Sequence, residues 1–311
     1  MNMRVLVTGS SGFLGRAVVA TLASSGHEVI AGTRRHDRLR DIHTISLDVT
    51  DRDSVRRSVL DSEPDAVVHL AGMTKMRESA SQPLAFYDVN TAGTLNVMHA
   101  VDELARDRKS PHIVFASTGA VYGSHPAIPQ REGDRTSTEN PYAASKLASE
   151  ELIRYHAKSG RSVATILRFS NIAGGVDNIY DDDGDHLIPR VLTAIQDDTP
   201  IAINGDGQTT RDFVHVSDAA EAVRLALLAR PNSDSVILNI GSGTEMAVQA
   251  IVEAAERATR KTARIERRPA GSEARRVVMS IDRATAHLGW KPVHVSADQL
   301  VTDAWSAFRH S

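Results

Sequence analysis

The chain has 311 residues, of which 41% are hydrophobic and 24% are charged, and its formal net charge is -3 at pH 7. A chain of this length can bury one large core or two smaller ones, and its near-neutral charge gives no reason to expect a nucleic-acid partner. Cysteine is absent, which excludes disulfides and thiolate chemistry. We see no leader peptide before the first predicted strand and no apolar run of membrane-spanning length, so we expect a cytoplasmic protein with no membrane partner. The 13 histidines lack zinc-like spacing, and we predict no metal site.

A strand, a glycine-rich turn and a helix are predicted at the start of the chain. Residues 4–8 read as a buried strand, and Gly9, Gly12 and Gly15 follow directly. The next apolar positions repeat with a helical period that ends at Gly26: Leu14, Val18, Val19 and Leu22. In such a turn the first glycine permits the tight bend, the second lets the backbone approach a pyrophosphate, and the third allows the helix to pack closely. We therefore predict a dinucleotide-binding site here.

A second motif places a phenol, Tyr142, and an ammonium, Lys146, four residues apart. Asn140 is a favoured helix N-cap and Pro141 a favoured first helical residue, so both side chains are expected on one face of a helix that begins here. A free tyrosine titrates near ~10, and base catalysis near neutral pH requires its pKa to fall by about 3 units, roughly 4 kcal/mol. One ammonium does not supply all of this stabilisation. The oxidised nicotinamide ring of a dinucleotide would provide the second positive charge.

Strand-like and helical segments alternate along the first half of the chain. The strand-like runs after the first are 27–33, 45–49, 66–71, 112–117 and 162–168. This alternation predicts an α/β fold with a doubly wound parallel sheet of the Rossmann type. The pattern is lost near residue 170, where an acidic loop at 181–185 precedes a helix that begins near Pro189.

We expect two domains from this change of pattern. Residues 1–170 would form the dinucleotide-binding domain, and residues 206–244 would return to it, with 236–240 as a further strand of the sheet. Residues 171–205 and 245–311 would form a smaller α/β lobe that binds the substrate.

Further short motifs are spread over nearly the whole length. In the first half they are DV (48–49), HLAG (69–72), YDVN (87–90), GT (93–94), STGAVYG (117–123) and LRFSN (167–171). In the second half they are HLIP (186–189), RDFVHV (211–216), NIGSG (239–243) and LGWKP (288–292). In this order they resemble the extended short-chain dehydrogenase/reductase family, and within it the nucleotide-sugar epimerase/dehydratase group.

The resemblance implies a bound NAD. It places Asp48 at the adenine, Ala71 and Gly72 near the pyrophosphate, and Lys146 at the nicotinamide ribose. The cofactor-binding residues that it implies are Gly9, Gly12, Phe13, Leu14, Gly15, Thr33, Arg34, Asp48, Val49, Leu70, Ala71, Gly72, Asn90, Ser117, Tyr142 and Lys146.

The resemblance also implies a catalytic set and a substrate site. Tyr142 would be the acid/base, Lys146 would depress its pKa, and Thr118 would hydrogen-bond the sugar hydroxyl. Four residues would hold the nucleotide diphosphate and its base together with Thr118: Asn171, Leu187, Arg211 and an arginine at 267 or 268, for which we choose Arg268.

Three positions depart from the family pattern. Strand two ends in Thr33 where NAD-using members usually have Asp, and Arg34 and Arg35 follow, which leaves NADP possible. Ser280 stands where the family often has Asp. The loop at 173–186 is short and acidic, so the identity of the sugar stays open.

The activity that the resemblance implies is 4-epimerisation of a nucleotide-diphosphate sugar, such as a UDP-hexose, by transient oxidation at C4. An NADP(H)-dependent 4-ketoreductase or dehydrogenase is the alternative. A 4,6-dehydratase would need an Asp-Glu pair at positions that hold Gly119 and Ala120 here. A non-catalytic dinucleotide sensor would not need Tyr142, Lys146 and Thr118 together. Family members often pair through helices near 95–107 and 142–158, so a homodimer is expected.

Overall fold

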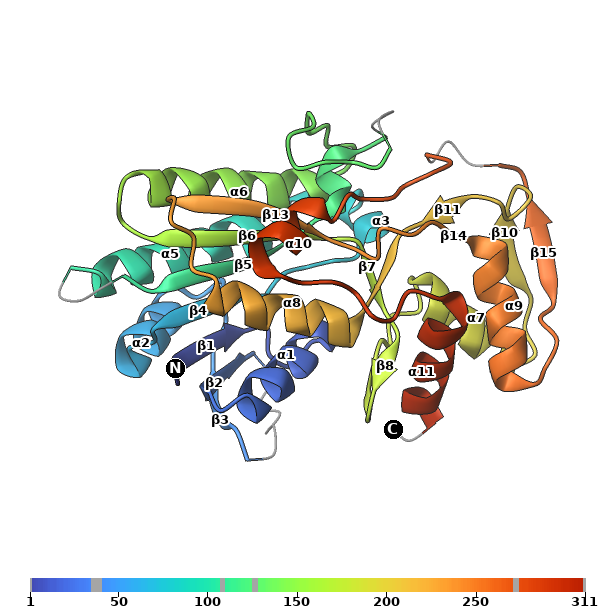
Figure 1. Cartoon of the computed structure of the whole chain (residues 1–311), viewed down its shortest axis with the longest axis horizontal. Coiled ribbons are helices and arrows are strands. Elements are labelled where there is room, and N and C mark those ends of the chain that lie inside the picture. Colours follow the sequence, from blue (N-terminus) through green and yellow to red (C-terminus); the bar gives the residue numbers. More distant parts are fainter. Residues whose placement is uncertain (1, 35–40, 107–109, 125–127, 271–273, 310–311) are drawn as a thin grey trace. The chain divides into compact units, whose positions relative to one another are not determined.

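The computed structural model describes residues 2–34, 41–106, 110–124, 128–270 and 274–309. The chain forms two compact units (Figure 1). The first consists of residues 1–123, 136–168 and 220–238, and the second of residues 124–135, 169–219 and 239–311.

A seven-stranded sheet is the centre of the first unit, with the order β13-β6-β5-β4-β1-β2-β3. Its strands span Arg4–Thr8 (β1), Glu28–Thr33 (β2), His43–Ser46 (β3), Ala66–His69 (β4), His112–Thr118 (β5), Val163–Phe169 (β6) and Ser235–Ile240 (β13). The pairs β1-β2, β2-β3, β1-β4 and β4-β5 are parallel. The strand order reverses between β1 and β4, and in open α/β sheets ligands bind at the carboxyl ends of the strands at such a point.

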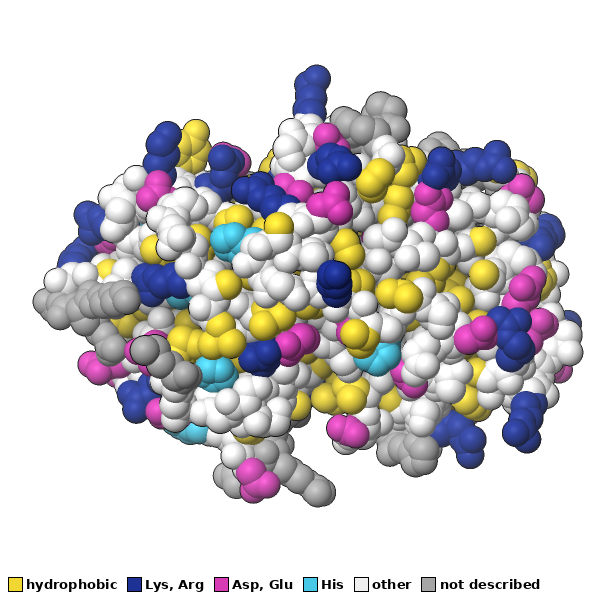
Figure 2. Space-filling view, in the orientation of Figure 1, with side chains coloured by type: hydrophobic (Ala, Val, Ile, Leu, Met, Phe, Trp, Pro, Cys, Tyr) yellow, Lys and Arg dark blue, Asp and Glu magenta, His cyan; other side chains and the backbone are white. Residues whose placement is uncertain are grey.

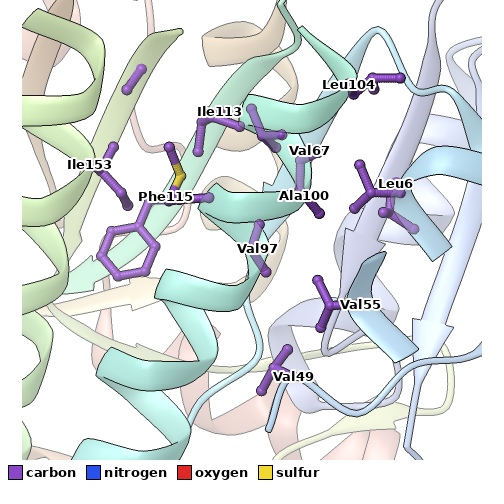
Figure 3. Packing of buried hydrophobic residues seen from close by; sticks show 14 of the residues in the cluster. Leu6, Val49, Val55, Val67, Val97, Ala100, Leu104, Ile113, Phe115 and Ile153 are labelled. Atoms are coloured by element: carbon purple, nitrogen blue, oxygen red, sulfur yellow. The ribbon is translucent and has the colours of Figure 1, made fainter. Parts of the chain in front are cut away.

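Helices cover both faces of this sheet, with α2, α5 and α6 on one face and α1 and α8 on the other (Figure 1). The helical segments here are α1 (Phe13–Ser24), α2 (Arg52–Ser62), α3 (Met76–Ser79), α4 (Pro83–Phe86), η1 (Tyr87–Ala92), α5 (Gly93–Leu104), η2 (Gly119–Tyr122), α6 (Pro141–Lys158) and α8 (Val216–Leu228). Figure 3 shows Leu6, Val67 and Ile113 of the strands packed against Val97 of α5 and Ile153 of α6. The inner strands β1, β4, β5 and β6 are largely buried, which explains their continuous apolar runs, whereas the edge strand β3 is not.

The predicted strands are confirmed, with one displacement. The run at 236–240 does return to the sheet, as β13 beside β6. The third strand lies at His43–Ser46 instead of 45–49. Asp48 ends it, because its Oδ1 accepts the backbone N–H of Thr50 at 2.9 Å and its carbonyl accepts the N–H of Asp51 at 3.1 Å, which turns the chain.

The described part of the second unit is built from helices and short strand pairs. Its elements are β7 (Asn171–Ala173), β8 (Gly175–Val176), β9 (Ile179–Tyr180), α7 (Leu187–Gln196), β10 (Ile201–Asn204), β11 (Thr210–Arg211), β12 (Phe213–His215), β14 (Met246–Ala247), α9 (Val248–Thr259), β15 (Ile265–Arg268), α10 (Asp282–Leu288) and α11 (Ala297–Arg309). The strand pairs are β7-β12, β8-β9, β10-β15 and β11-β14. Val191 of α7, Ile251 of α9 and Val301 of α11 meet in one core.

The division differs from the expected domain boundaries. Residues 206–219 and 239–244 cluster with the second unit, because β11 pairs with β14 and β12 pairs with β7. Residues 124–135 also belong there, since the backbone of Gln130 is hydrogen-bonded to Val278 and Ser280.

The described surface carries charges of both signs. On the face drawn in Figure 2, Lys and Arg side chains are interspersed with Asp and Glu. Within the described ranges no helix has the length and apolarity to cross a bilayer. No group of three or more His, Cys, Asp or Glu in these ranges is arranged to hold a metal ion.

Candidate active site

The turn after β1 requires glycine at two of its three positions. Gly9 has a φ of +70°, and a Cβ there would lie 2.6 Å from the backbone nitrogen of Ala71. A Cβ on Gly15 would lie 2.1 Å from the carbonyl oxygen of Gly9. The first turn of α1 can therefore approach the loop this closely only without a side chain at Gly15.

Gly12 differs from Gly9 and Gly15, because the surrounding protein atoms leave room for a Cβ at this position. A Cβ on this exposed residue would meet only the carbonyl oxygen of Gly9, at an ordinary 3.4 Å. Gly12 is the N-cap of α1, has no side-chain cap and precedes a first turn without an acidic residue. The N–H groups of this turn, which includes Phe13 and Leu14, carry partial positive charge that suits a phosphate. These residues fit the pyrophosphate of a dinucleotide.

The end of β2 carries Thr33, the position at which the family resemblance implies an Asp in NAD-using members. Thr33 is buried, and its hydroxyl donates to Ser11 Oγ at 3.1 Å in the glycine turn. Arg34 is exposed. Arg35 lies outside the described residues. Thr33 thus links β2 to the turn, while Arg34 lies at the surface.

Asp48 and Val49 follow β3 and have structural contacts of their own. Asp48 Oδ1 accepts the hydroxyl of Thr50 at 2.8 Å as well as its N–H. Val49 is buried against Gly93, where a Cβ would come within 2.9 Å of the valine side chain. Asp48 is half-buried and fixed by these bonds.

The ends of β1 and β4 are joined by side-chain hydrogen bonds. Thr8 Oγ1 lies 2.7 Å from His69 Nδ1, and His69 Nε2 lies 3.0 Å from Thr94 Oγ1. The N–H of Leu70 donates to Thr8 O at 3.2 Å, and that of Ala71 donates to Thr8 Oγ1 at 3.2 Å. The backbone at the switch point of the sheet is therefore held in place.

The loop after β4 lies against Asn90 and Lys146. A Cβ on Gly72 would be 2.9 Å from Asn90 Oδ1 and 3.8 Å from Lys146 Nζ. Asn90 is buried; its Oδ1 accepts from Met73 N at 2.7 Å, and its Nδ2 donates to Met73 O at 3.1 Å and Ser145 Oγ at 3.0 Å. Asn90 thereby joins this loop to α6 and holds Gly72 beside Lys146.

Lys146 is buried, with its Nζ 4.2 Å from the centroid of the Phe115 ring. Burial lowers the pKa of Lys146 to about 7, and the nearby carboxylate of Glu150 acts in the opposite direction. Burial, with a smaller effect from the charge of Lys146, lowers the pKa of His69 to about 3. His69 is therefore neutral at physiological pH, whereas Lys146 titrates in the neutral range.

Tyr142 lies in the first turn of α6, as predicted. The Asn140 side chain accepts the N–H of Ala143 at 2.9 Å and caps the helix. Burial raises the pKa of Tyr142, and a hydrogen bond with the Thr118 side chain lowers it by a smaller amount. Thr118 Oγ1 also accepts the N–H of Ala120 at 3.1 Å. The structure thus brings Tyr142 and Thr118 into contact, one helical turn from Lys146.

A buried ion pair behind these groups was missed by the sequence analysis. Arg168 of β6 donates to Glu150 of α6, from Nε to Oε1 at 3.0 Å and from Nη2 to Oε2 at 2.6 Å. The hydroxyl of Ser117 also donates to Glu150 Oε1. All three side chains are buried, and Arg168 lies over the ring of Tyr122. The available signal was spacing, since Glu150 follows Lys146 by four residues.

Apart from Thr118, the predicted substrate residues lie in the second unit, where Asn171 of β7 pairs with Phe213 of β12, two residues after Arg211. The Nδ2 of Asn171 donates to the carbonyl of Asp212 at 2.9 Å. Arg211 Nη1 donates to Thr210 O at 2.8 Å and Ala274 O at 2.9 Å, so its guanidinium is oriented by the backbone.

The other two predicted substrate residues are on separate elements of this unit. Leu187 begins α7 and packs on the core of the unit. Arg268 ends β15, is exposed, and has Glu266 Oε2 3.7 Å away. Arg267 instead donates to Gln249 Oε1 at 3.0 Å.

Asp212, beside Arg211, is a second feature that the sequence did not reveal. It is buried, and its carboxylate accepts the N–H groups of Ser242, Gly243 and Met279 at 2.7, 3.3 and 3.2 Å. Burial raises its pKa, and these bonds oppose that effect. Asp212 therefore ties the RDF segment to two loops that lie far along the chain.

A parallel sheet whose strand order reverses beside β1, followed by a glycine turn at the start of α1, is typical of dinucleotide-binding α/β proteins. The chain belongs to the NAD dependent epimerase/dehydratase family, which its residues 5–241 match.

Individual relatives agree with this assignment over nearly the full length. The chain is 33% identical to the UDP-glucose 4-epimerase of Azospirillum brasilense, across 97% of this chain and 91% of that protein. Its fold is similar to the crystal structure of the Thermus thermophilus UDP-glucose 4-epimerase in complex with NAD, with a TM-score of 0.85, 28% identity and coverage of 99% and 100%. It is also similar to MoeE5 in complex with UDP-glucuronic acid and NAD, with a TM-score of 0.86, 28% identity and coverage of 98% and 99%.

Proposed function

We propose that the protein is a nucleotide-sugar 4-epimerase that uses NAD and acts on a UDP-hexose. The observation that supports this most is the full-length similarity to UDP-glucose 4-epimerases, combined with the contact between Thr118 and Tyr142 one turn from Lys146. The glycine turn, the β4 loop and Lys146 would hold the cofactor. Asn171, Leu187, Arg211 and Arg268 would hold the nucleotide diphosphate.

In this proposal Tyr142, as a phenolate, removes the proton of the sugar 4-hydroxyl and later returns it. Thr118 hydrogen-bonds Tyr142 and orients the same hydroxyl. Burial raises the pKa of Tyr142 and so favours the protonated phenol. In this proposal the positive charge of Lys146 opposes that effect by stabilising the phenolate. NAD, held by the glycine turn, the β4 loop and Lys146, would supply the second positive charge and a reversible hydride acceptor for C4, which is the chemistry that inversion at this carbon requires.

The test is to denature the purified protein, identify the released cofactor by spectrum and mass, and incubate the native protein with UDP-hexoses without added nicotinamide. Bound NAD with turnover supports the epimerase. A requirement for stoichiometric NADPH would indicate the 4-ketoreductase, and cofactor binding without turnover would indicate a sensor. Gly119 and Ala120, which stand at the Asp-Glu positions of the dehydratases, argue against 4,6-dehydration.

Arg34→Ala is expected to change the affinities for NAD and NADP equally, by less than ~0.5 kcal/mol, because the side chain is exposed at the end of β2. Side-by-side titrations with both cofactors measure this. A selective loss of NADP affinity of ~1.5 to 3 kcal/mol, the value of a hydrogen bond to a charged group, would show instead that Arg34 binds a 2′-phosphate.

UDP-glucose is expected to be a better substrate than UDP-glucuronate. No Lys or Arg lies between Phe169 and Pro189, whereas five aspartates do: Asp177, Asp181, Asp182, Asp183 and Asp185. A substrate carboxylate beside this loop would be repelled. His186 Nδ1 lies 2.7 Å from Asp181 Oδ2, so Asp181 compensates the charge of His186 when the imidazole is protonated. A higher kcat/KM for UDP-glucuronate, the sugar nucleotide bound in the MoeE5 structure, would contradict this expectation.

We further propose a cytoplasmic homodimer that pairs through α5 and α6. Leu95 of α5 and Tyr155 of α6 are exposed apolar side chains that support such a contact. Light scattering of the purified protein measures its mass in solution.

A further inference from the structure

We propose that Glu150 is a positioning residue of the active site, which fixes the strand end that carries Thr118 and holds a compensating negative charge beside Lys146. This inference rests on the proposed function for its catalytic consequence. Its structural basis lies within the first unit.

Glu150 connects α6 and β5, which carry the proposed catalytic groups, to the neighbouring strand β6. It lies on α6 four and eight residues after Lys146 and Tyr142, so the three side chains share one helical face. Its Oε1 accepts the hydroxyl of Ser117, the residue before Thr118 at the end of β5. Arg168 of β6 holds the same carboxylate at both oxygens. A single buried carboxylate thus ties the strand end that carries Thr118 to the helix that carries Tyr142.

Glu150 is also the negative charge of this cluster. Of the titratable groups around Lys146, Glu150 interacts with it from α6 and His69 from β4, and Tyr142 precedes it by one helical turn. Phe115 of β5 and Asn90 of η1 are uncharged neighbours. His69 is neutral, so without Glu150 the cations Lys146 and Arg168 would share a buried region without an anion.

The first test is a pH titration of Lys146 by NMR with ¹³C-labelled lysine in the NAD-bound protein. The chain has only six lysines, and Lys146→Arg identifies the signal. Glu150→Gln keeps the size of the side chain and removes its charge, so the Lys146 midpoint should fall by about 1 unit or more. Glu150→Asp should keep the midpoint close to that of the wild type. The control is Glu151→Gln, because the Glu151 side chain is 43% accessible, lies on the same helix and pairs with Arg154.

An unchanged Lys146 midpoint in Glu150→Gln would overturn the charge role. This measurement needs no turnover, so it stands even if no UDP-hexose is epimerised and the proposed function fails. In an active protein, the loss of kcat with rising pH should begin at lower pH in Glu150→Gln than in the wild type. If the ion pair had only a structural role, Glu150→Gln would lower the melting temperature without changing the pH at which kcat begins to fall.

If Glu150→Gln does not fold, Ser117→Ala provides a second test of the same proposal. It removes the hydroxyl that Glu150 holds and leaves the ion pair with Arg168 intact. We expect kcat to fall roughly 2- to 10-fold, as for the loss of one hydrogen bond, with KM and the Lys146 midpoint unchanged. Wild-type kcat in Ser117→Ala would overturn the positioning of Thr118 through this contact.

Discussion

Tyr142→Phe is expected to lower turnover by roughly 10²- to 10⁴-fold, the usual contribution of a positioned proton-transfer group. The fold and the bound NAD should be retained, because the ring keeps its edge-to-face contact with Phe86, at a centroid distance of 6.3 Å. The measurement is kcat at saturating UDP-hexose between pH ~6 and ~10. Lys146→Ala should in addition weaken the retention of NAD, since it removes the cation beside the β4 loop.

Tyr155→Phe is the matched control for Tyr142→Phe. Tyr155 lies on the same helix but is 67% exposed, so loss of its hydroxyl should leave kcat unchanged. Near-normal activity of Tyr142→Phe throughout the pH range would remove this tyrosine from the mechanism. Equal losses in both variants would point to damage to α6 rather than to proton transfer.

Gly15→Ala and Gly12→Ala are expected to fail in different ways. The Cβ added at Gly15 would collide with the carbonyl of Gly9, so the protein should lose about 3 kcal/mol of unfolding free energy even without NAD. The Cβ added at Gly12 has room in the protein alone. Gly12→Ala should therefore keep the melting temperature of the NAD-free protein and lose most of the increase that NAD produces.

The measurement is thermal unfolding of both variants with and without NAD. Gly133→Ala is the control, because no atom lies within 4 Å of the added Cβ, and it should resemble the wild type in both conditions. A wild-type response of Gly12→Ala to NAD would show that the pyrophosphate does not approach this residue. Wild-type stability of Gly15→Ala would show that α1 can move away from the turn.

The amino-acid sequence by itself determined the features that depend on near neighbours in the chain. The apolar run at 4–8 and the glycine turn after it predicted β1 and α1. Both signals are local, because the repeat of apolar residues and the φ preference of glycine depend only on neighbouring positions. The four-residue spacing of Tyr142 and Lys146, with the cap at Asn140, predicted one helical face for the same reason. The strand predicted at 45–49 lies at 43–46, because a turn stabilised by the Asp48 side chain follows it. The apolar pattern of a sequence does not reveal such a turn.

Only the tertiary structure decided the electrostatics of the candidate site. The pKa of Lys146 depends on its burial and on Glu150, and the pairing of Glu150 with Arg168 joins α6 to β6. The residues assigned to the second unit likewise depend on strand pairs between distant segments, such as β7 with β12. Desolvation and charge pairing arise from what other parts of the chain place around a side chain. A sequence pattern therefore identified Tyr142 and Lys146 as a pair. Only the fold shows that burial raises the pKa of Tyr142 and lowers the pKa of Lys146.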